Sequence, residues 1–238
     1  MTQTASDKDV VPTGKFRVGL NGSNATHVIV NADGTISGLS ADLGNFIAGK
    51  LGVPFAPVLY ASSAPFTESF SKSEWEIVLT GRNPFAETKV DFLTDVFLID
   101  YVYVAARGQQ FSGVDDVDRR GVRIAVPLNA SADAFLSRRL KSAELVRVAG
   151  DTNAAIELLR SGKADLYASS IQNGLEIARA IPGARVLGAF ETVRFAASVP
   201  KGTSSAVQAR LTGLVNEAKA AGVVRKALEK LEGVRVAD

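Results

Sequence analysis

Short apolar segments alternate with segments of helical periodicity along most of the 238-residue chain. Compact apolar runs indicate buried strands, whereas apolar residues spaced by three and four positions indicate one face of a helix. Regular alternation of the two is typical of strand–helix–strand units with largely parallel sheets. The pattern therefore predicts an α/β protein.

The first part of the chain contains the signals of a complete α/β body. We expect strands at residues 16–20, 55–60 and 76–79, and helices at residues 39–51 and 65–70. Gly52 is placed to end the first helix, because glycine favours the left-handed conformation of a helix C-terminus. The Asp33-Gly34 pair predicts a hairpin or a tight loop.

A second body follows, because the same pattern begins again after residue 106. We expect strands at residues 122–126, 145–148 and 164–168, and helices at residues 132–140 and 152–161. A C-terminal helix should include residues 207–218.

Two extended apolar segments, residues 96–106 and 194–199, are predicted to cross between the two bodies side by side. We assign residues 1–103 and 199–238 to lobe one and residues 104–198 to lobe two. Two crossings restrict relative motion to a hinge, and the cleft between the lobes becomes the expected ligand site.

The composition excludes several classes of chemistry. The chain has no cysteine and one histidine, so it has neither disulfides nor thiolate metal sites and cannot assemble a cluster of histidine ligands. Its 27 Lys and Arg residues balance 25 Asp and Glu residues and are scattered, which gives no nucleic-acid-binding pattern. No phosphate-binding glycine motif follows a strand, so no cofactor is expected.

No apolar run is long enough to cross a membrane, so we expect no membrane insertion. The first residues, MTQTASDKDVVPTGK, are polar and lack the apolar stretch of a signal peptide. Two explanations remain open at this point: either a leader was removed, or the protein stays in the cytoplasm.

Several segments, in order along nearly the whole chain, resemble the bacterial extracellular solute-binding family that serves amino-acid ABC transporters. They are GLSADLGNFIAGKLG at 38–52, SEWEIV at 73–78, NPFAETKVDF at 83–92, GVRIAV at 121–126, LLRSGKADLYAS at 158–169 and SVPKG at 198–202. The resemblance implies a two-lobed type II periplasmic-binding fold with a small-molecule ligand between the lobes. It also implies a monomer in the periplasm and an ABC transporter membrane subunit as partner.

The chain departs from this family at the positions that would hold an amino acid. The family places an Arg five residues before Asp91 to bind the ligand carboxylate, and this sequence has Ala86 there. It places an Asp five residues after Asp165 to pair with the ligand ammonium, and this sequence has Ser170 there. Because both charges are missing, we expect a ligand other than an ordinary L-amino acid. Two interpretations of Arg82 stay open: it either substitutes for the carboxylate-binding Arg or is an exposed residue of the loop after a strand.

Polar residues at strand ends are the candidates for ligand binding, because ligands bind beyond the carboxyl ends of parallel strands. They are Asn21, Ser23, Asn24, Tyr60, Ser62, Thr80, Arg82, Asn129, Ser131 and Ser170. Asn, Ser and Thr both donate and accept hydrogen bonds, which favours a neutral polar or singly anionic ligand. We expect Trp75 to lie in the core, and His27 to be a surface or core residue rather than a ligand contact.

Two alternatives to a solute receptor remain open. A cyclohexadienyl-dehydratase-like enzyme would need a carboxylic acid in the cleft, for which Glu191 and Asp133 are the nearest candidates. No acidic residue stands at these strand ends, so we favour a protein without catalytic residues. The other alternative is a stand-alone sensor or effector-binding pair of lobes.

Overall fold

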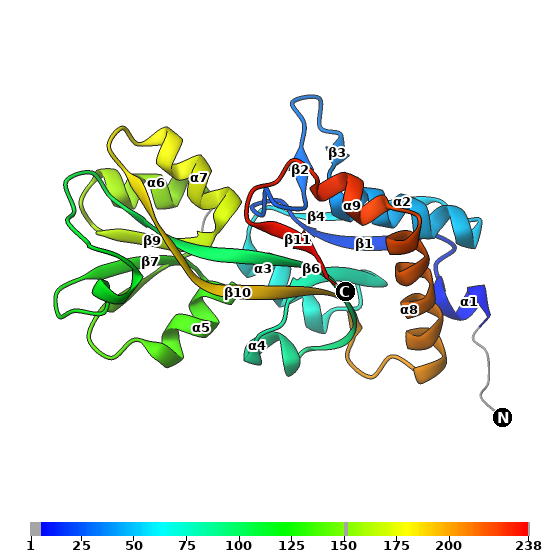
Figure 1. The fold of residues 1–238 in the computed structure, drawn as a ribbon. Coiled ribbons are helices and arrows are strands. Elements are labelled where there is room, and N and C mark those ends of the chain that lie inside the picture. Colours follow the sequence, from blue (N-terminus) through cyan, green and yellow to red (C-terminus); the bar gives the residue numbers. More distant parts are fainter. Residues whose placement is uncertain (1–5, 150–151, 238) are drawn as a thin grey trace.

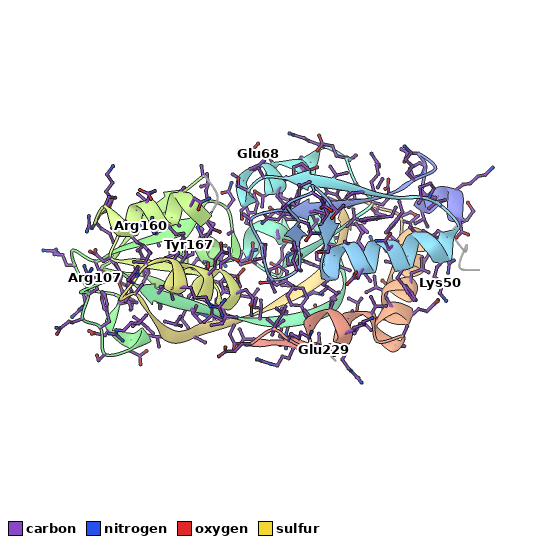
Figure 2. The ribbon with its side chains drawn as sticks, turned by 90° about the horizontal axis from the view of Figure 1, so that it is seen from above. Lys50, Glu68, Arg107, Arg160, Tyr167 and Glu229 are labelled. Atoms are coloured by element: carbon purple, nitrogen blue, oxygen red, sulfur yellow. The ribbon has the colours of Figure 1, made fainter. Side chains whose placement is uncertain are left out.

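The computed structural model describes residues 6–149 and 152–237, and it has the α/β architecture expected from the sequence. Two lobes lie end to end and are joined by a pair of long strands (Figure 1). The residues that Figure 2 labels divide between the lobes, with Lys50, Glu68 and Glu229 on one and Arg107, Arg160 and Tyr167 on the other.

Parallel strands form the centre of the first lobe. β1 (Phe16–Asn21) pairs in parallel with both β4 (Phe55–Tyr60) and β5 (Ile77–Gly81). The remaining elements that begin in this part of the chain are α1 (Asp7–Val10), α2 (Leu39–Leu51), α3 (Ser63–Glu68), the 3-10 turn Ser69–Ser71 and α4 (Pro84–Glu87).

Two of the local predictions for this lobe are confirmed. α2 ends at Gly52, whose φ of 66° is the left-handed conformation expected there. The Asp33-Gly34 turn joins β2 (Ile29–Val30) and β3 (Ile36–Ser37) in an antiparallel hairpin.

The second lobe repeats the parallel arrangement. β7 (Arg123–Pro127) pairs in parallel with β8 (Glu144–Val148) and with β9 (Leu166–Ser170). Its helical elements are the 3-10 turn Val114–Asp116, α5 (Ser131–Arg139), α6 (Thr152–Arg160) and α7 (Ile171–Ala180). The sequence pattern did not predict α7, because Asn173 and Gly174 interrupt its apolar face.

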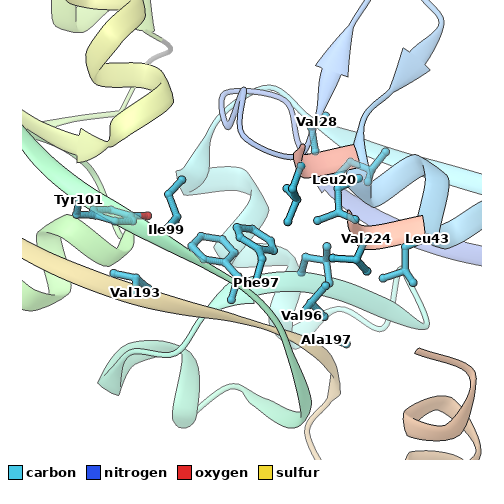
Figure 3. Packing of buried hydrophobic residues seen from close by; sticks show 14 of the residues in the cluster. Leu20, Val28, Leu43, Val96, Phe97, Ile99, Tyr101, Val193, Ala197 and Val224 are labelled. Atoms are coloured by element: carbon cyan, nitrogen blue, oxygen red, sulfur yellow. The ribbon is translucent and has the colours of Figure 1, made fainter. Parts of the chain in front are cut away.

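The two predicted crossing segments lie in strands that pair with each other, and these strands are longer than expected. β6 (Val90–Ala105) and β10 (Arg185–Pro200) pair antiparallel over both lobes, with Phe195 opposite Phe97. They complete the strand order β4-β1-β5-β10-β6-β9-β7-β8, so one hydrogen-bonded sheet continues from lobe to lobe. The hydrophobic cluster is continuous along β6 as well, from Tyr101 to Val96 (Figure 3).

The chain returns to the first lobe after β10. α8 (Ser205–Ala220) and α9 (Val223–Leu228) pack against α2, and Lys50 forms an ion pair with Glu217 of α8. The last strand, β11 (Val234–Val236), adds to β6.

Candidate functional site

The carboxyl ends of the parallel strands of both lobes face each other across a cleft. Two adjoining cavities lie in it, one of about 30 Å³ (cavity 1) and one of about 40 Å³ (cavity 2). Both are lined by Asn21, Asn24, Ser63, Tyr101 and Ala130. The two cavities are therefore parts of one site, which in this arrangement of the lobes holds only a few water-sized groups.

Cavity 1 lies between the loop after β1 and the start of α7. The carboxamide of Asn21 donates to Ser63 Oγ at 3.1 Å and accepts from Ser23 Oγ at 2.8 Å. Ser170 ends β9 and donates through Oγ to Asn173 Oδ1 at 3.3 Å. These bonds hold donor and acceptor groups of both lobes at the wall of the cavity.

Cavity 2 lies between the end of β5 and the start of α5. Asn83 caps α4 by accepting from the Ala86 N–H at 2.9 Å, and its amide donates to Ser131 Oγ at 3.3 Å. Asn129 takes the left-handed conformation, with φ of 61°, in the turn that precedes Ser131. Thr80 and His27 also line this cavity.

Direct hydrogen bonds between the lobes close the cleft. Besides Asn83–Ser131, the Asn173 amide donates to the Ser23 carbonyl at 2.9 Å, and Ser62 Oγ donates to the Ala149 carbonyl at 3.1 Å. The structure therefore represents a state in which the lobes touch.

All described residues that line the two cavities are uncharged at neutral pH. Ala86 lines cavity 2 and Ser170 lines cavity 1, so both positions at which the resemblance would place a charged group are in the site. Burial lowers the pKa of His27 to about 3, which leaves its imidazole neutral. Burial also raises the pKa of Tyr167 to about 12 and keeps that of Tyr101 well above its usual value.

The structure brings seven of the ten candidate residues to the cavities. They are Asn21, Ser23, Asn24, Thr80, Asn129, Ser131 and Ser170. Ser62 stands beside them and makes the contact between the lobes described above.

Arg82 and Tyr60 are not among the described residues that line the cavities. Arg82 forms an ion pair with Asp95 of β6, and its guanidinium lies 4.6 Å from the ring centroid of Phe92. Tyr60 donates its hydroxyl to Glu74 at 2.6 Å. Each side chain satisfies its polar group within the first lobe, away from the cleft.

The two acids considered for catalysis are also engaged elsewhere. Glu191 forms an ion pair with Arg139, and Asp133 binds Arg147 and the backbone N–H of Asn129. Neither carboxylate is among the described residues of the cavities.

Several lining residues were not indicated by the sequence pattern, namely Ser63, Asn83, Tyr101, Tyr167, Ser169 and Asn173. One signal was available for Asn83, because an Asn followed by Pro84 is a typical helix start. His27, which the sequence placed outside the ligand contacts, lies both in the core and at cavity 2. Trp75 lies in the core as predicted, 1% exposed.

Within residues 6–149 and 152–237, no group of three or more acidic or histidine side chains could hold a metal ion. Over the same residues, no helix has the length and apolarity needed to span a bilayer.

Comparison with known proteins shows the fold of the chain. No family model matches the sequence, and no curated protein matches it. A solved solute receptor for L-cysteine of Neisseria gonorrhoeae superposes with a TM-score of 0.83 at 18% identity, covering 98% of this chain and 100% of that one. A mutant of ArgBP from T. maritima has a TM-score of 0.80 at 20% identity, with 94% and 97% covered.

An ancestral amino-acid-binding protein, described as a precursor of cyclohexadienyl dehydratase, also has a TM-score of 0.80 at 18% identity, with 95% and 99% covered. At these identities the likeness establishes the architecture, which is the two-lobed α/β fold of type II periplasmic-binding proteins. The fold predicted from the sequence resemblance is confirmed.

Proposed function

We propose that the chain is a non-catalytic binding protein that closes its two lobes around one small, uncharged polar molecule. The fold supports this proposal, because a cleft at the carboxyl ends of parallel strands is the usual ligand site of such architectures. The described walls of the cleft carry carboxamides, hydroxyls and aromatic rings and no carboxylate or ammonium group.

The observation that carries the proposal is the neutral pair Ala86 and Ser170. Each lines a cavity at a position where the resembled receptors hold one charge of an amino-acid zwitterion. Enclosing an ion without a partner costs several kcal/mol, which is about the whole binding free energy of a weak complex. A standard L-amino acid is therefore a poor ligand for this cleft, whatever the solved neighbours bind.

The uncharged polar and aromatic groups that line the cavities indicate the class of ligand. Asn21, Thr80 and Ser131 each offer a donor and an acceptor, and Tyr101 supplies a flat apolar surface. A small molecule with hydroxyl or carboxamide groups matches this set. The wider setting is part of the same proposal: a monomer in the periplasm, partnered by an ABC transporter membrane subunit, with lobe boundaries near residues 103 and 199.

A thermal-shift panel tests the proposed function. We expect one or more neutral polyols, sugars or carboxamides to raise the melting temperature by several degrees, since a ligand at 100 times its Kd stabilises the native state by about 2.7 kcal/mol. The twenty standard amino acids at millimolar concentration should leave it unchanged.

Two variants make the panel specific to the cleft. Asn21→Ala, which alters both cavities, should lose the response to the stabilising compound. Asn45→Ala, which removes an exposed amide bonded to the Ala41 carbonyl on α2, should keep it. Strong stabilisation by a charged amino acid, or an unchanged response in the Asn21 variant, would contradict the proposal.

A further inference from the structure

The only histidine of the chain is held firmly between β1 and α2. His27 is 2% exposed, and its backbone carbonyl accepts from the Ser40 N–H at 3.0 Å. The imidazole packs at a tilt against Phe97 and Phe195, with ring centroids 5.7 and 5.4 Å away. Its position is therefore fixed by the core and not by solvent.

The two ring nitrogens of His27 have different surroundings. Nδ1 lies 2.7 Å from Ser40 Oγ, which is a short hydrogen bond. Nε2 is fully buried and, within the described part of the chain, has no hydrogen-bond partner. The residue lines cavity 2, as Thr80 and Asn83 do. Buried polar atoms are nearly always satisfied, so an unpaired nitrogen on a residue that lines a cavity points to a partner bound there.

We propose that His27 is a specificity-determining residue of the cleft, whose Nε2 hydrogen-bonds an uncharged hydroxyl or carboxamide group of the ligand in cavity 2. This inference rests on the proposed function, and it states which chemical group of the ligand would bind in cavity 2. Ser40 can accept from Nδ1–H, which makes Nε2 an acceptor, or donate to Nδ1, which makes Nε2–H a donor.

The pairing with Ser40 explains why the partner should be uncharged. A hydroxyl or a carboxamide has both a donor and an acceptor, so it matches either tautomer of His27. A carboxylate matches only Nε2–H and an ammonium only the lone pair, and each would bring a charge that no described residue of cavity 2 balances. The imidazole adds no charge itself, because burial lowers its pKa to about 3.

Nitrogen NMR on the untagged protein tests this assignment, since one histidine gives one pair of ring signals. The probe is acetamide, a neutral carboxamide of few atoms, in keeping with a cavity that holds a few water-sized groups. Titration with acetamide should move the Nε2 signal of ¹⁵N-histidine-labelled protein saturably and leave Nδ1 nearly unchanged. Sodium acetate at the same concentration and ionic strength should move neither signal.

Each other result overturns the inference. An Nε2 signal that ignores acetamide means that no ligand group reaches it. An Nε2 signal that follows acetate as strongly as acetamide means that the cavity does not select against charge.

The variant His27→Phe separates recognition from packing. It keeps a ring and removes the unpaired nitrogen, but it also leaves the buried Ser40 Oγ without its hydrogen bond to Nδ1, so its melting temperature should fall by only a few degrees. The affinity for acetamide, measured by the thermal shift at several concentrations, should nevertheless fall about tenfold or more. Asn45→Ala is the control and should bind as the wild type does. If His27 had only a structural role, the His27→Phe variant would bind acetamide with the same affinity as the wild type.

The outcomes also separate this inference from the proposed function. If a charged amino acid stabilises the protein strongly but acetamide, and not acetate, still moves Nε2, the proposed function fails and the role of His27 in cavity 2 stands. If a compound of the panel binds and leaves Nε2 unmoved, the inference about His27 fails alone.

Discussion

A single buried imidazole makes the stability of this protein depend on pH. In the unfolded chain His27 has an ordinary pKa near 6.5 and takes up a proton below it, whereas in the folded protein its pKa is about 3. Between these values the unfolded state binds more protons than the folded state, so acidification favours unfolding.

We therefore expect stability from His27 to be lost as the pH falls below about 6.5. The slope should be roughly 1.4 kcal/mol per pH unit, or about 2 kcal/mol between pH 6.5 and pH 5. Urea unfolding of wild type and His27→Phe at pH 7.5 and pH 5 measures this loss as the difference between the two proteins. Parallel pH dependences would mean that the imidazole is solvated in the folded state.

Arg82 illustrates how little a sequence says about the direction of one long side chain. Its position, just after a strand of the first lobe, is as predicted, yet its guanidinium binds Asp95 and stacks on Phe92. Both partners come from β6, which pairs with β10 and not with the strand that precedes Arg82. The bond to Asp95, thirteen residues further along the chain, determines the orientation of the Arg82 side chain.

At the level of elements, the two lobes join their parallel strands by the same kind of Arg–carboxylate interaction. Arg17 at the start of β1 donates from its backbone and its guanidinium to Glu76, which precedes β5. Arg123 at the start of β7 does the same with Asp165, which precedes β9. Both pairs lie at the amino ends of their strands, opposite the cleft.

The pair in the second lobe should contribute measurably to stability. Burial opposes the ionisation of Asp165, but hydrogen bonds from the side chain and backbone of Arg123 hold its pKa below the usual range. Asp165→Asn removes the charge from these bonds and should lower the free energy of unfolding by about 1.5 to 3 kcal/mol at pH 7.

Urea unfolding measures the effect, with Glu157→Gln as the control. Glu157 forms an exposed ion pair with Arg160 within α6, so its loss should cost less than about 0.5 kcal/mol. Equal effects of the two substitutions would show that the Arg123–Asp165 pair is no more than a surface contact. Because the pKa of Asp165 is lowered in the folded state, its contribution should disappear as the pH falls through the acidic range.

At the scale of the whole molecule, closure depends on close approach of β5 to α5. A Cβ added at Gly81, the last residue of β5, would lie 2.4 Å from Ser131 Oγ, across the cleft. An alanine at this position would force the Ser131 hydroxyl to move, which disfavours the close contact between the lobes.

Gly81→Ala should hold the lobes apart and increase the radius of gyration measured by small-angle X-ray scattering. Adding Ser131→Ala, which removes the nearest atom, should restore much of the compactness. Gly49→Ala is the control, because a Cβ there meets nothing within 4 Å. A radius of gyration unchanged by Gly81→Ala would show that the contact does not limit closure.

The sequence by itself determined the local structure and the overall plan. The alternating periodicities predicted the α/β class, Gly52 the end of α2, and the two long apolar segments the paired strands that join the lobes. These features depend on residues close to one another in the chain, where periodicity and backbone preference act directly. The neutral positions Ala86 and Ser170 were also readable from the sequence.

Only the tertiary structure decided which side chains meet in the cleft. Asn21, Asn83, Tyr101 and Asn173 come from four separate elements and from both lobes, and their spacing depends on strand order and on closure. His27 shows the same limit, since a lone histidine has no periodicity that would predict one ring nitrogen bonded to Ser40 and the other without a partner among the described residues. Local patterns specify elements, whereas a site is specified by contacts between residues far apart in the chain, which form only when the whole sheet has assembled.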